Sequence, residues 1–595
     1  MDSFSDPINL NSLLEVTQIE LSSLLGSLEP ADGAAKVLYA SPTIFSTLNA
    51  ICDLDASFLS GIGVSGVFPF SVEDTPAVAN HAIFLVSSDV DLLRMFATTL
   101  ISYAEKNPDS SLHVFFVPKK TLVIEHLLEN EYQELLSTPK LHIGEFEWDA
   151  FPLDEDVVSM QLPHAFRRLA GDGDMTIPYL CARMLLKLQS SLFGSIPLIR
   201  GKGAHASKVV QILKQMRSEV GSAHLMGIAP KIDSLLVIDR SLDLLTPLLT
   251  QMTYEGIIDE FFSIDCGCLA LPCNIGEGSN VNAGDRIVLS NKDKMFKEIR
   301  NKNFAYIGGA LHNKSILIKQ NYEKRKELQQ LRELKDFMKE LPEMQEMHRL
   351  IGVHTSIATE IRKKAQTIDF RRRIAIEQYI VQQINEREVL DYIEELIIES
   401  APIAEVLRLL SMYSIVNGGL KAKTYDSLKQ LMMLSYDIPL IMATLMCLDR
   451  CGLISKYNAK RSNYTSLRKQ FKLWVTDPQD RQPNDIGSAY GGYIPLSVRV
   501  LEEMIMHPEL WGKPGSLVET LPEGKAEASY EGETPEGPPV TMIFFVGGIT
   551  HAEMNCIRML QAKLDGADQA RRIVVASTDM VNGVSIISSA MPYSV

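Results

Sequence analysis

The sequence has little of what secreted, membrane-spanning or nucleic-acid-binding proteins usually carry. Its 8 cysteines are scattered through 595 residues, so we expect free thiols and a reducing compartment rather than a disulfide framework. The chain opens on MDSFSDPINL, which has neither a basic stretch nor a long apolar run, so no signal peptide is apparent. Lys and Arg total 58 against 74 Asp and Glu, a net charge of -16. This acidic balance disfavours nucleic acid as a partner and a broad electrostatic hold on anionic membranes.

An uninterrupted apolar stretch that could span a membrane is also missing. The best candidate is residues 431–448, LMMLSYDIPLIMATLMCL, but Asp437 and Pro439 interrupt its centre. A charge in the middle of a bilayer is costly, and proline disturbs the helix that would have to span it. The stretch therefore predicts a pair of buried helices in a cytoplasmic protein rather than an anchor.

Motifs for metal, nucleotide or nucleophilic chemistry are incomplete wherever they begin. Cys266, Cys268 and Cys273 lack a fourth zinc ligand. GIGVSG at residues 61–66 is followed by VFPF, which does not readily start the helix that a dinucleotide fingerprint needs. GKG at residues 201–203 lacks both the first glycine and the hydroxyl residue of a phosphate-binding loop. We therefore predict no metal, no cofactor and no small-molecule substrate.

The sequence does contain short apolar runs that alternate with amphipathic helical patterns. KVLYA, AIFLV and HVFFV fall within the first 150 residues, and LLVI, TMIFFV and RIVVA follow at residues 235–238, 541–546 and 572–576. Alternation of this kind predicts parallel sheets covered by helices. The pattern of residues 247–485 is mostly helical. We therefore expect an α/β plus all-α protein, in which a large helical domain is inserted into the second of two α/β domains.

Two carboxylates beside the strand at residues 235–238 raise the question of catalysis. Asp239 and Asp243 flank Arg240 in the run IDRSLD, and the end of a parallel strand suits a phosphoryl-transfer nucleophile. One hypothesis is therefore a metal-dependent phosphohydrolase with Asp239 as its nucleophile. Such a site needs its second aspartate two residues further on, however, where Ser241 stands, and Arg240 would neutralise the acids. The spacing favours a buried, hydrogen-bonded joint between two domains.

The same region carries a family resemblance. LLVIDRSLDLLTPLLTQMTYEGIIDE, at residues 235–260, resembles the signature of the SM family, the Sec/Munc-type regulators of SNARE-driven membrane fusion. VFFVPKKTLVIEHLL, PLDEDVVSM, GGYIPLSVRVLEEM and FFVGGITHAEM agree with the family pattern in order along the chain. KEIRNKNFAYIGGAL and ELPEMQEMHRLIGVHTSIATEI are similar to the group called vacuolar protein sorting-associated protein 33. TPLLTQMTYEG and HTSIA resemble the A-type of that group more than the B-type.

The resemblance implies an arch of three domains without catalytic residues. We expect domain 1 at residues 1–150, the two segments of domain 2 at 151–246 and 486–595, and the two helical halves of domain 3 at 247–370 and 371–485. Residues 522–539, PEGKAEASYEGETPEGPP, are rich in Pro, Gly and Glu, and this composition predicts a mobile loop.

The partners that the resemblance implies are SNARE proteins and the subunits of tethering complexes. Proteins of this group bind SNARE helices and promote their assembly as subunits of HOPS and CORVET, docked through vacuolar protein sorting-associated protein 16. The expected location is cytoplasmic, with peripheral association, through partners, on endosome, late endosome, lysosome or vacuole membranes.

Helical stretches within residues 247–485 offer candidate contact surfaces, although ordinary core packing is the alternative for each. Residues 322–341 and 343–364 carry apolar stripes at helical spacing, and an antiparallel pair of such helices can leave a groove for an amphipathic SNARE helix. Pro342 is expected to end or kink the first of them. The candidate SNARE-binding residues are Leu334, Met338, Met344, Met347, Leu350, His354 and Ile357. The candidate residues for docking a tether subunit are Tyr436, Leu440, Tyr464 and Trp474. The predicted domain joint consists of Asp239, Arg240, Asp243, Thr246, Pro247, Tyr254 and Glu255.

Overall fold

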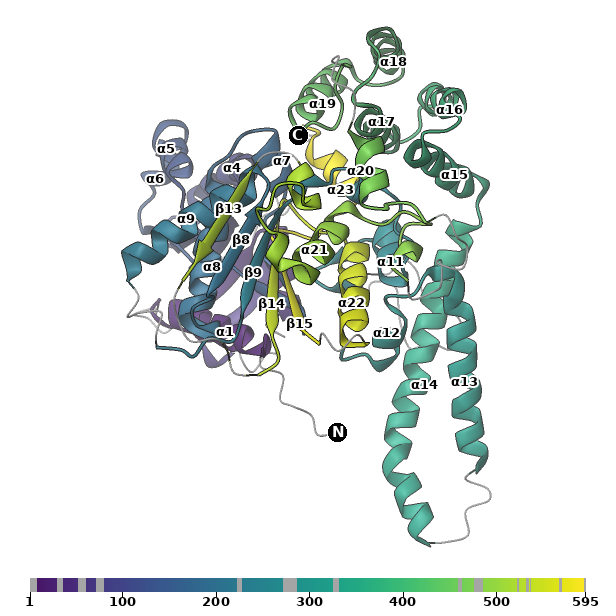
Figure 1. The fold of residues 1–595 in the computed structure, drawn as a ribbon. Helices are drawn as coiled ribbons and strands as arrows, with labels where there is room; N and C mark the ends of the chain where they lie inside the picture. Colours follow the sequence, from purple (N-terminus) through teal and green to yellow (C-terminus); the bar gives the residue numbers. More distant parts are fainter. Residues whose placement is uncertain are drawn as a thin grey trace.

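Two large β-sheets, a small third sheet and a long helical region make up the described part of the protein in a computed structural model (Figure 1). The two large sheets with their covering helices form one body, and a pair of long helices projects away from it. The structure describes residues 8–28, 36–51, 60–70, 80–221, 227–270, 286–324, 331–457, 463–475, 485–521, 524–530, 535, 537–566 and 570–592.

The first sheet has five parallel strands in the order β2-β1-β3-β4-β5. They are β1 (Lys36–Ala40), β2 (Val64–Pro69), β3 (His81–Ser87), β4 (Ser111–Val117) and β5 (Leu141–Glu145). Helices α1 (Asn11–Gly26) and α2 (Pro42–Ile51) cover one face, and α4 (Val90–Lys106) and α5 (Leu122–Glu131) cover the other. The run AIFLV in β3 is apolar throughout because this strand lies between two others and between two layers of helices.

The second sheet takes its strands from both ends of the chain. Its order is β13-β8-β9-β14-β15-β7-β6. The central parallel strands are β8 (Leu198–Lys202), β9 (Ser234–Asp239), β14 (Val540–Val546), β15 (Arg572–Ser577) and β7 (Val157–Ser159). Phe544 of β14 lies opposite Val237 of β9 on one side and Ala576 of β15 on the other. The chain between β9 and β14 is therefore inserted into this sheet.

Both edges of the second sheet are antiparallel strands, and one of these strands lies where the sequence predicts a mobile loop. β6 (Phe151–Asp154) pairs with β7, and β13 (Lys525–Ser529) pairs with β8. The mobile loop predicted at residues 522–539 is therefore wrong for the five residues of β13, while residues 522–523, 531–534 and 536 lie outside the described residues. An edge strand has one face on the core and needs few apolar residues, and in β13 Ala528 alone is buried. Because KAEAS is mostly polar, its sequence does not show the apolar run that would predict a strand.

The inserted region is helical, as the sequence predicts. It contains α11 (Tyr254–Phe262), α12 (Lys294–Ile299), α13 (Ile307–Lys324), α14 (Leu331–Ala365), α15 (Ile368–Gln382), α16 (Glu386–Ile398), α17 (Ile403–Asn417), α18 (Ala422–Ser435), α19 (Ile438–Arg450) and α20 (Tyr464–Gln470). A small antiparallel sheet of β10 (Ile264–Asp265), β11 (Cys268–Ala270) and β12 (Arg286–Val288) follows α11. The chain then returns to the second sheet through α21 (Leu496–Met506), and α22 (His551–Gly566) connects β14 to β15.

The projecting hairpin consists of α13 and α14, which differs from the pairing expected from the sequence (Figure 1). Pro342 lies inside the 35-residue helix α14 and does not end it. Proline removes one backbone hydrogen bond, which a long helix tolerates as a local disturbance. The two apolar stripes predicted on either side of Pro342 therefore belong to one helix, and the partner of that helix is α13.

The apolar stretch at residues 431–448 forms the end of α18 and most of α19, so the expected break into two helices is correct. The expected burial is wrong in part, because each helix buries one face and Leu434, Ile438 and Met446 are exposed. Asp437 caps α19 by accepting a hydrogen bond from the N–H of Leu440 at 3.0 Å. Among the described residues, none of the helices is long and apolar enough to cross a membrane.

Candidate functional site

Asp239, at the end of β9, is sealed inside the protein. It is 2% exposed, and its carboxylate accepts hydrogen bonds from the backbone N–H groups of His205 (2.7 Å) and Ser241 (2.9 Å). Burial raises its pKa, but the bonds from His205 and Ser241 outweigh burial, so the pKa of Asp239 lies below its ordinary value. Gly203 packs so closely that a Cβ at this position would lie 2.2 Å from Cβ of Asp239. The phosphohydrolase hypothesis requires Asp239 to be open to a substrate, and the structure contradicts it because Asp239 is buried.

Arg240 and Asp243 form a second buried cluster with residues from the end of the chain. Nη1 of Arg240 lies 2.9 Å from both carboxylate oxygens of Glu553 on α22, and Nε donates to the carbonyl of Asp243 at 2.9 Å. The Asp243 carboxylate accepts hydrogen bonds from Thr246 N–H (3.0 Å) and Ser497 N–H (2.9 Å). Every charge has a partner, so this cluster joins β9 to α21 and α22 and leaves the acids no vacant position for a metal.

Glu255, on α11, forms the third cluster. Its carboxylate accepts hydrogen bonds from Arg300 at 2.9 and 2.5 Å and from Arg558 of α22 at 3.0 Å. Burial raises its pKa, but Arg300 and Arg558 hold the pKa of Glu255 well below its ordinary value. Arg300 also pairs with Asp154 at the end of β6. The cluster thus connects the helical insertion to the second sheet.

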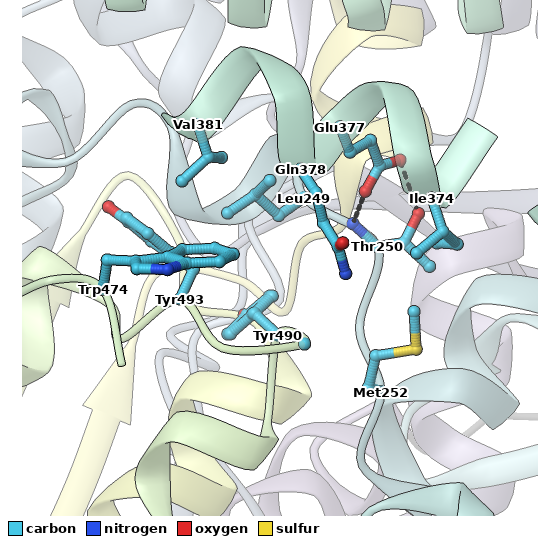
Figure 2. Close-up of a pocket in the computed structure, with 11 residues that line it drawn as sticks. Leu249, Thr250, Met252, Ile374, Glu377, Gln378, Val381, Trp474, Tyr490 and Tyr493 are labelled. Carbon is cyan, nitrogen blue, oxygen red and sulfur yellow. Dashed lines mark hydrogen bonds between the residues drawn. The ribbon is translucent and has the colours of Figure 1, made fainter. Parts of the chain in front are cut away.

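Figure 2 shows a fourth contact of the joint, in which α15 reaches the chain that follows β9. Glu377 accepts hydrogen bonds from the N–H and the hydroxyl of Thr250 at 2.9 and 2.7 Å. The aromatic rings of Trp474, Tyr490 and Tyr493 border the space beside this contact. The cavity has a volume of only about 10 Å³, which holds a single water at most. It is therefore a packing gap rather than a ligand site.

The structure brings together all seven residues of the predicted joint. Asp239, Arg240, Asp243, Thr246, Pro247, Tyr254 and Glu255 are buried. Their partners Glu553 and Arg300 were missed, because a residue 313 positions away, such as Glu553 from Arg240, carries no pairing signal in a single sequence. Within the part of the chain that the structure describes, no group of His, Cys, Asp and Glu could hold a metal ion.

A cleft of about 1220 Å³ separates α14 from the two α/β units. Met347, Leu350 and Val353 of α14 line one wall, and β6, β12 and the start of α1 line the others. Charged side chains of both signs, including Glu346 and Arg349, border the apolar strip. The result is an open, concave surface with an apolar strip and a mixed-charge rim.

The predicted SNARE-binding residues divide into three groups. Met344 and Met347 are half-buried on α14, and Leu350 is buried at the wall of the cleft. His354 and Ile357 are fully buried. The His354 ring lies 3.0 Å from both the Tyr254 hydroxyl and the Asp293 carboxylate. These last two are packing residues rather than contact residues, which corrects the prediction. Leu334 and Met338 lie outside the residues whose side chains the structure describes.

The predicted tether-docking residues are only partly accessible. Tyr436 and Leu440 are half-buried, and so is Trp474 in the domain joint. Tyr464 is 7% exposed, and its hydroxyl donates to the carbonyl of Val381 at 2.9 Å. Tyr464 is therefore a packing residue, which corrects the prediction for it.

Sequence reasoning missed the most exposed apolar side chains of this region. They are Leu434, which is 84% exposed, with Met446 at 58% and Ile438 at 48%. All three lie within the apolar stretch at residues 431–448, where nearly every residue is apolar. Only their position away from the buried stripe of Met432, Ile441 and Leu445 could have marked them as outward-facing.

Comparison with known sequences relates nearly the whole chain to one family. Residues 36–589 match the model of the Sec1 family. Vacuolar protein sorting-associated protein 33A from Rattus norvegicus is 32% identical over 606 residues, covering 98% of each chain. The vacuolar protein-sorting-associated protein 33 homolog of Arabidopsis thaliana is 30% identical with the same coverage. The human B-type protein is 27% identical over 87% of this chain and 88% of its own length. The predicted similarity to the A-type over the B-type is thus confirmed.

Solved structures of the same fold cover the chain equally well. The SM protein Vps45 in complex with the Qa SNARE Tlg2 has a TM-score of 0.56 at 16% identity and covers 98% of both chains. The Unc18–syntaxin 1 complex from Monosiga brevicollis has a TM-score of 0.56 at 15% identity, over 98% of this chain and 99% of that one. The predicted fold class is confirmed by these matches.

Proposed function

The chain belongs to the Sec1 family of SM proteins, which regulate SNAREs and are not enzymes, and we propose that it binds SNARE helices along α14 and the cleft beside it. A SNARE motif is an amphipathic helix, and an apolar strip between charged borders is the surface that receives such a helix. By holding one helix in position, the hairpin lowers the entropic barrier to assembling the SNARE bundle and so promotes membrane fusion.

The observation that carries this proposal is the geometry of α14 beside the cleft. A helix of 35 residues is about 50 Å long, which gives a partner helix many turns to pack against. Met347, Leu350 and Val353 supply the apolar strip, and Glu346 and Arg349 supply charges of both signs at its edge. Methionine suits a surface that accepts more than one sequence, because its side chain adapts its shape. SM proteins of the same fold in complex with SNAREs, reported above, support this assignment.

The test uses two matched pairs of substitutions. We expect Met344→Asp with Met347→Asp to weaken the binding of SNARE-motif peptides about ten-fold or more in titration calorimetry, since it places one charge on the apolar strip and a second one turn before it on α14. The control is Leu434→Asp with Met446→Asp, which makes the same chemical change on exposed residues of α18 and α19. Binding that is unchanged in the first pair, or equally weakened in both, would contradict the proposal.

We further propose that the chain works as a subunit of the HOPS or CORVET tethering complex on endosome and lysosome or vacuole membranes. The relatives named for vacuolar protein sorting support this assignment. Docking to vacuolar protein sorting-associated protein 16 would use the exposed apolar side chains of α18 and α19, with half-buried Tyr436 and Leu440 between them. Leu434, Ile438 and Met446 are too exposed to stabilise this chain alone and would gain burial against a partner.

Co-purification tests the docking proposal with the same two double variants, but here the α18–α19 variant is the test and the α14 variant is the control. Leu434→Asp with Met446→Asp should abolish recovery of the tether subunit, because both charges would have to be buried in the interface. Met344→Asp with Met347→Asp should recover it in full. An undiminished yield from the first variant would rule out this surface.

A further inference from the structure

A second large cavity lies on a different part of the molecule, where the C-terminal end of α15, α20 and the start of α21 meet. Its volume is about 550 Å³. Four cationic side chains line it, namely Arg468, Lys469, Lys472 and Arg499, together with the indole of Trp474. None of these residues borders the cleft beside α14, and Leu434, Ile438 and Met446 do not line this cavity.

The charge of this cavity is opposite to that of the protein. The chain has a net charge of -16, yet among its described lining residues the cavity has four cations and no carboxylate. Within the described chain, no ion pair joins Arg468, Lys469 or Lys472 to an acid, and Lys469 and Lys472 are exposed. Of the four cations only Arg499 has a carboxylate partner among the described residues, Glu502. The other three repel one another, so an anion that bridged them would be stabilised.

Arg499 adds a second, independent observation. Its Nη1 donates to Glu502 at 2.6 Å, but its Nε is buried and has no hydrogen-bond partner. A buried donor without an acceptor carries a free-energy cost that a bound oxyanion would remove. Arg468 is partly engaged, since its Nη1 donates to the carbonyl of Val381 at the end of α15, which leaves its other N–H groups as donors.

We propose that this cavity binds a polyphosphorylated inositol, either free or as the headgroup of a membrane lipid. A volume of about 550 Å³ is that of a small-molecule site. It exceeds the volume of a single phosphate, and a small-molecule site of this kind is not the long groove that an extended acidic peptide needs. Guanidinium groups match phosphate oxygens in geometry, and lysines add point charge. The face of Trp474 provides an apolar surface for the ring that carries the phosphates. Because α20 belongs to the helical insertion and α21 to the second α/β unit, the ligand would link the two.

The test measures binding of inositol hexakisphosphate to the full chain by titration calorimetry. We expect Lys469→Glu with Lys472→Glu to weaken binding at least ten-fold and to reduce its dependence on salt. Both lysines are exposed, so the variant should retain the fold, which its unfolding midpoint would verify. The control is Lys214→Glu with Lys423→Glu, which changes the net charge equally at two exposed lysines elsewhere and should bind as the wild type does.

The source of the phosphates is distinguished by flotation with phosphatidylcholine vesicles, with and without phosphatidylinositol 4,5-bisphosphate. Recruitment by the phosphoinositide that inositol hexakisphosphate competes away identifies a lipid headgroup. Saturable binding of the free compound without recruitment identifies a soluble ligand. The proposal is overturned if the wild type does not bind inositol hexakisphosphate, if both lysine variants bind it equally, or if polyglutamate competes as strongly as the inositol phosphate does.

Discussion

The domain joint and the surface of α14 use charged residues in opposite ways. In the joint, the side chains of Arg240 and Glu553 are 1% and 0% exposed and are 2.9 Å apart. On α14, the pair Arg349–Glu346 is equally short at 2.7 Å, but its side chains are 60% and 54% exposed. A buried pair holds parts of the chain in one geometry, and losing either partner leaves a buried charge. An exposed pair contributes little to stability and leaves the surface available to a partner.

The largest effect should come from breaking the buried pair. Glu553→Gln leaves the guanidinium of Arg240 buried with only Asp243 as a counter-charge, at 3.7 Å. We expect the free energy of unfolding to fall by about 3–5 kcal/mol. The matched change on α14, Glu346→Gln, should lower it by less than about 1 kcal/mol. Urea unfolding followed by circular dichroism compares the two. Similar losses would mean that burial does not distinguish the regions.

Glycine substitutions should differ in sign between the two regions. Gly203 has a φ of +102° and is packed on Asp239, so Gly203→Ala should destabilise the protein by roughly 1–3 kcal/mol. Gly352 is exposed on α14 with nothing within 4 Å of an added Cβ. Gly352→Ala should therefore stabilise the protein by about 0.5–1 kcal/mol. Thermal unfolding midpoints that shift in the same direction for both variants would refute this contrast.

The effect of acid on stability should also differ between the two regions, by less than the effects of the substitutions above. The pKa of Glu255 is held well below its ordinary value of 4.5 in the folded protein. The stabilisation it gives is therefore fully present at pH 7 and is lost as pH falls below about 4.5. Glu255→Gln should be less stable than the wild type at pH 7, and the difference should shrink as the pH falls. Glu346→Gln should stay close to the wild type at every pH, because solvent screens its ion pair. A constant deficit for Glu255→Gln between pH 7 and pH 3 would contradict this assignment.

Six of the parallel strands, β1, β3, β4, β9, β14 and β15, could be read from the sequence because each is a short apolar run that is mostly buried. AIFLV and TMIFFV are examples. The parallel strands β2 and β5 were not predicted, since VSGVFP and LHIGE are largely half-buried or exposed. The strand β13 could not be read in this way, since KAEAS has only one buried residue. Pro342 was misleading because proline is a statistical helix breaker, whereas the packing of α14 against α13 and the core keeps that helix continuous.

The candidate contact residues show the limits of helical periodicity. A stripe at spacings of three and four identifies a buried face, and on α14 the stripe contains both Met347 in the cleft and Ile357 in the core. Periodicity does not reveal where along a helix the covering chain ends, because that depends on residues distant in sequence. In α18 and α19, only the position of Leu434 and Met446 away from the buried stripe separates them from their buried neighbours.

The most direct test combines binding and stability in one set of proteins. SNARE-peptide affinity and the unfolding midpoint would be measured for the wild type, for Met344→Asp with Met347→Asp, and for Glu553→Gln at a temperature where it stays folded. We expect the α14 variant to lose binding with little change in its midpoint, and Glu553→Gln to bind normally with a clearly lower midpoint. Binding lost in Glu553→Gln but retained in the α14 variant would show that the joint, and not the hairpin, is the working surface.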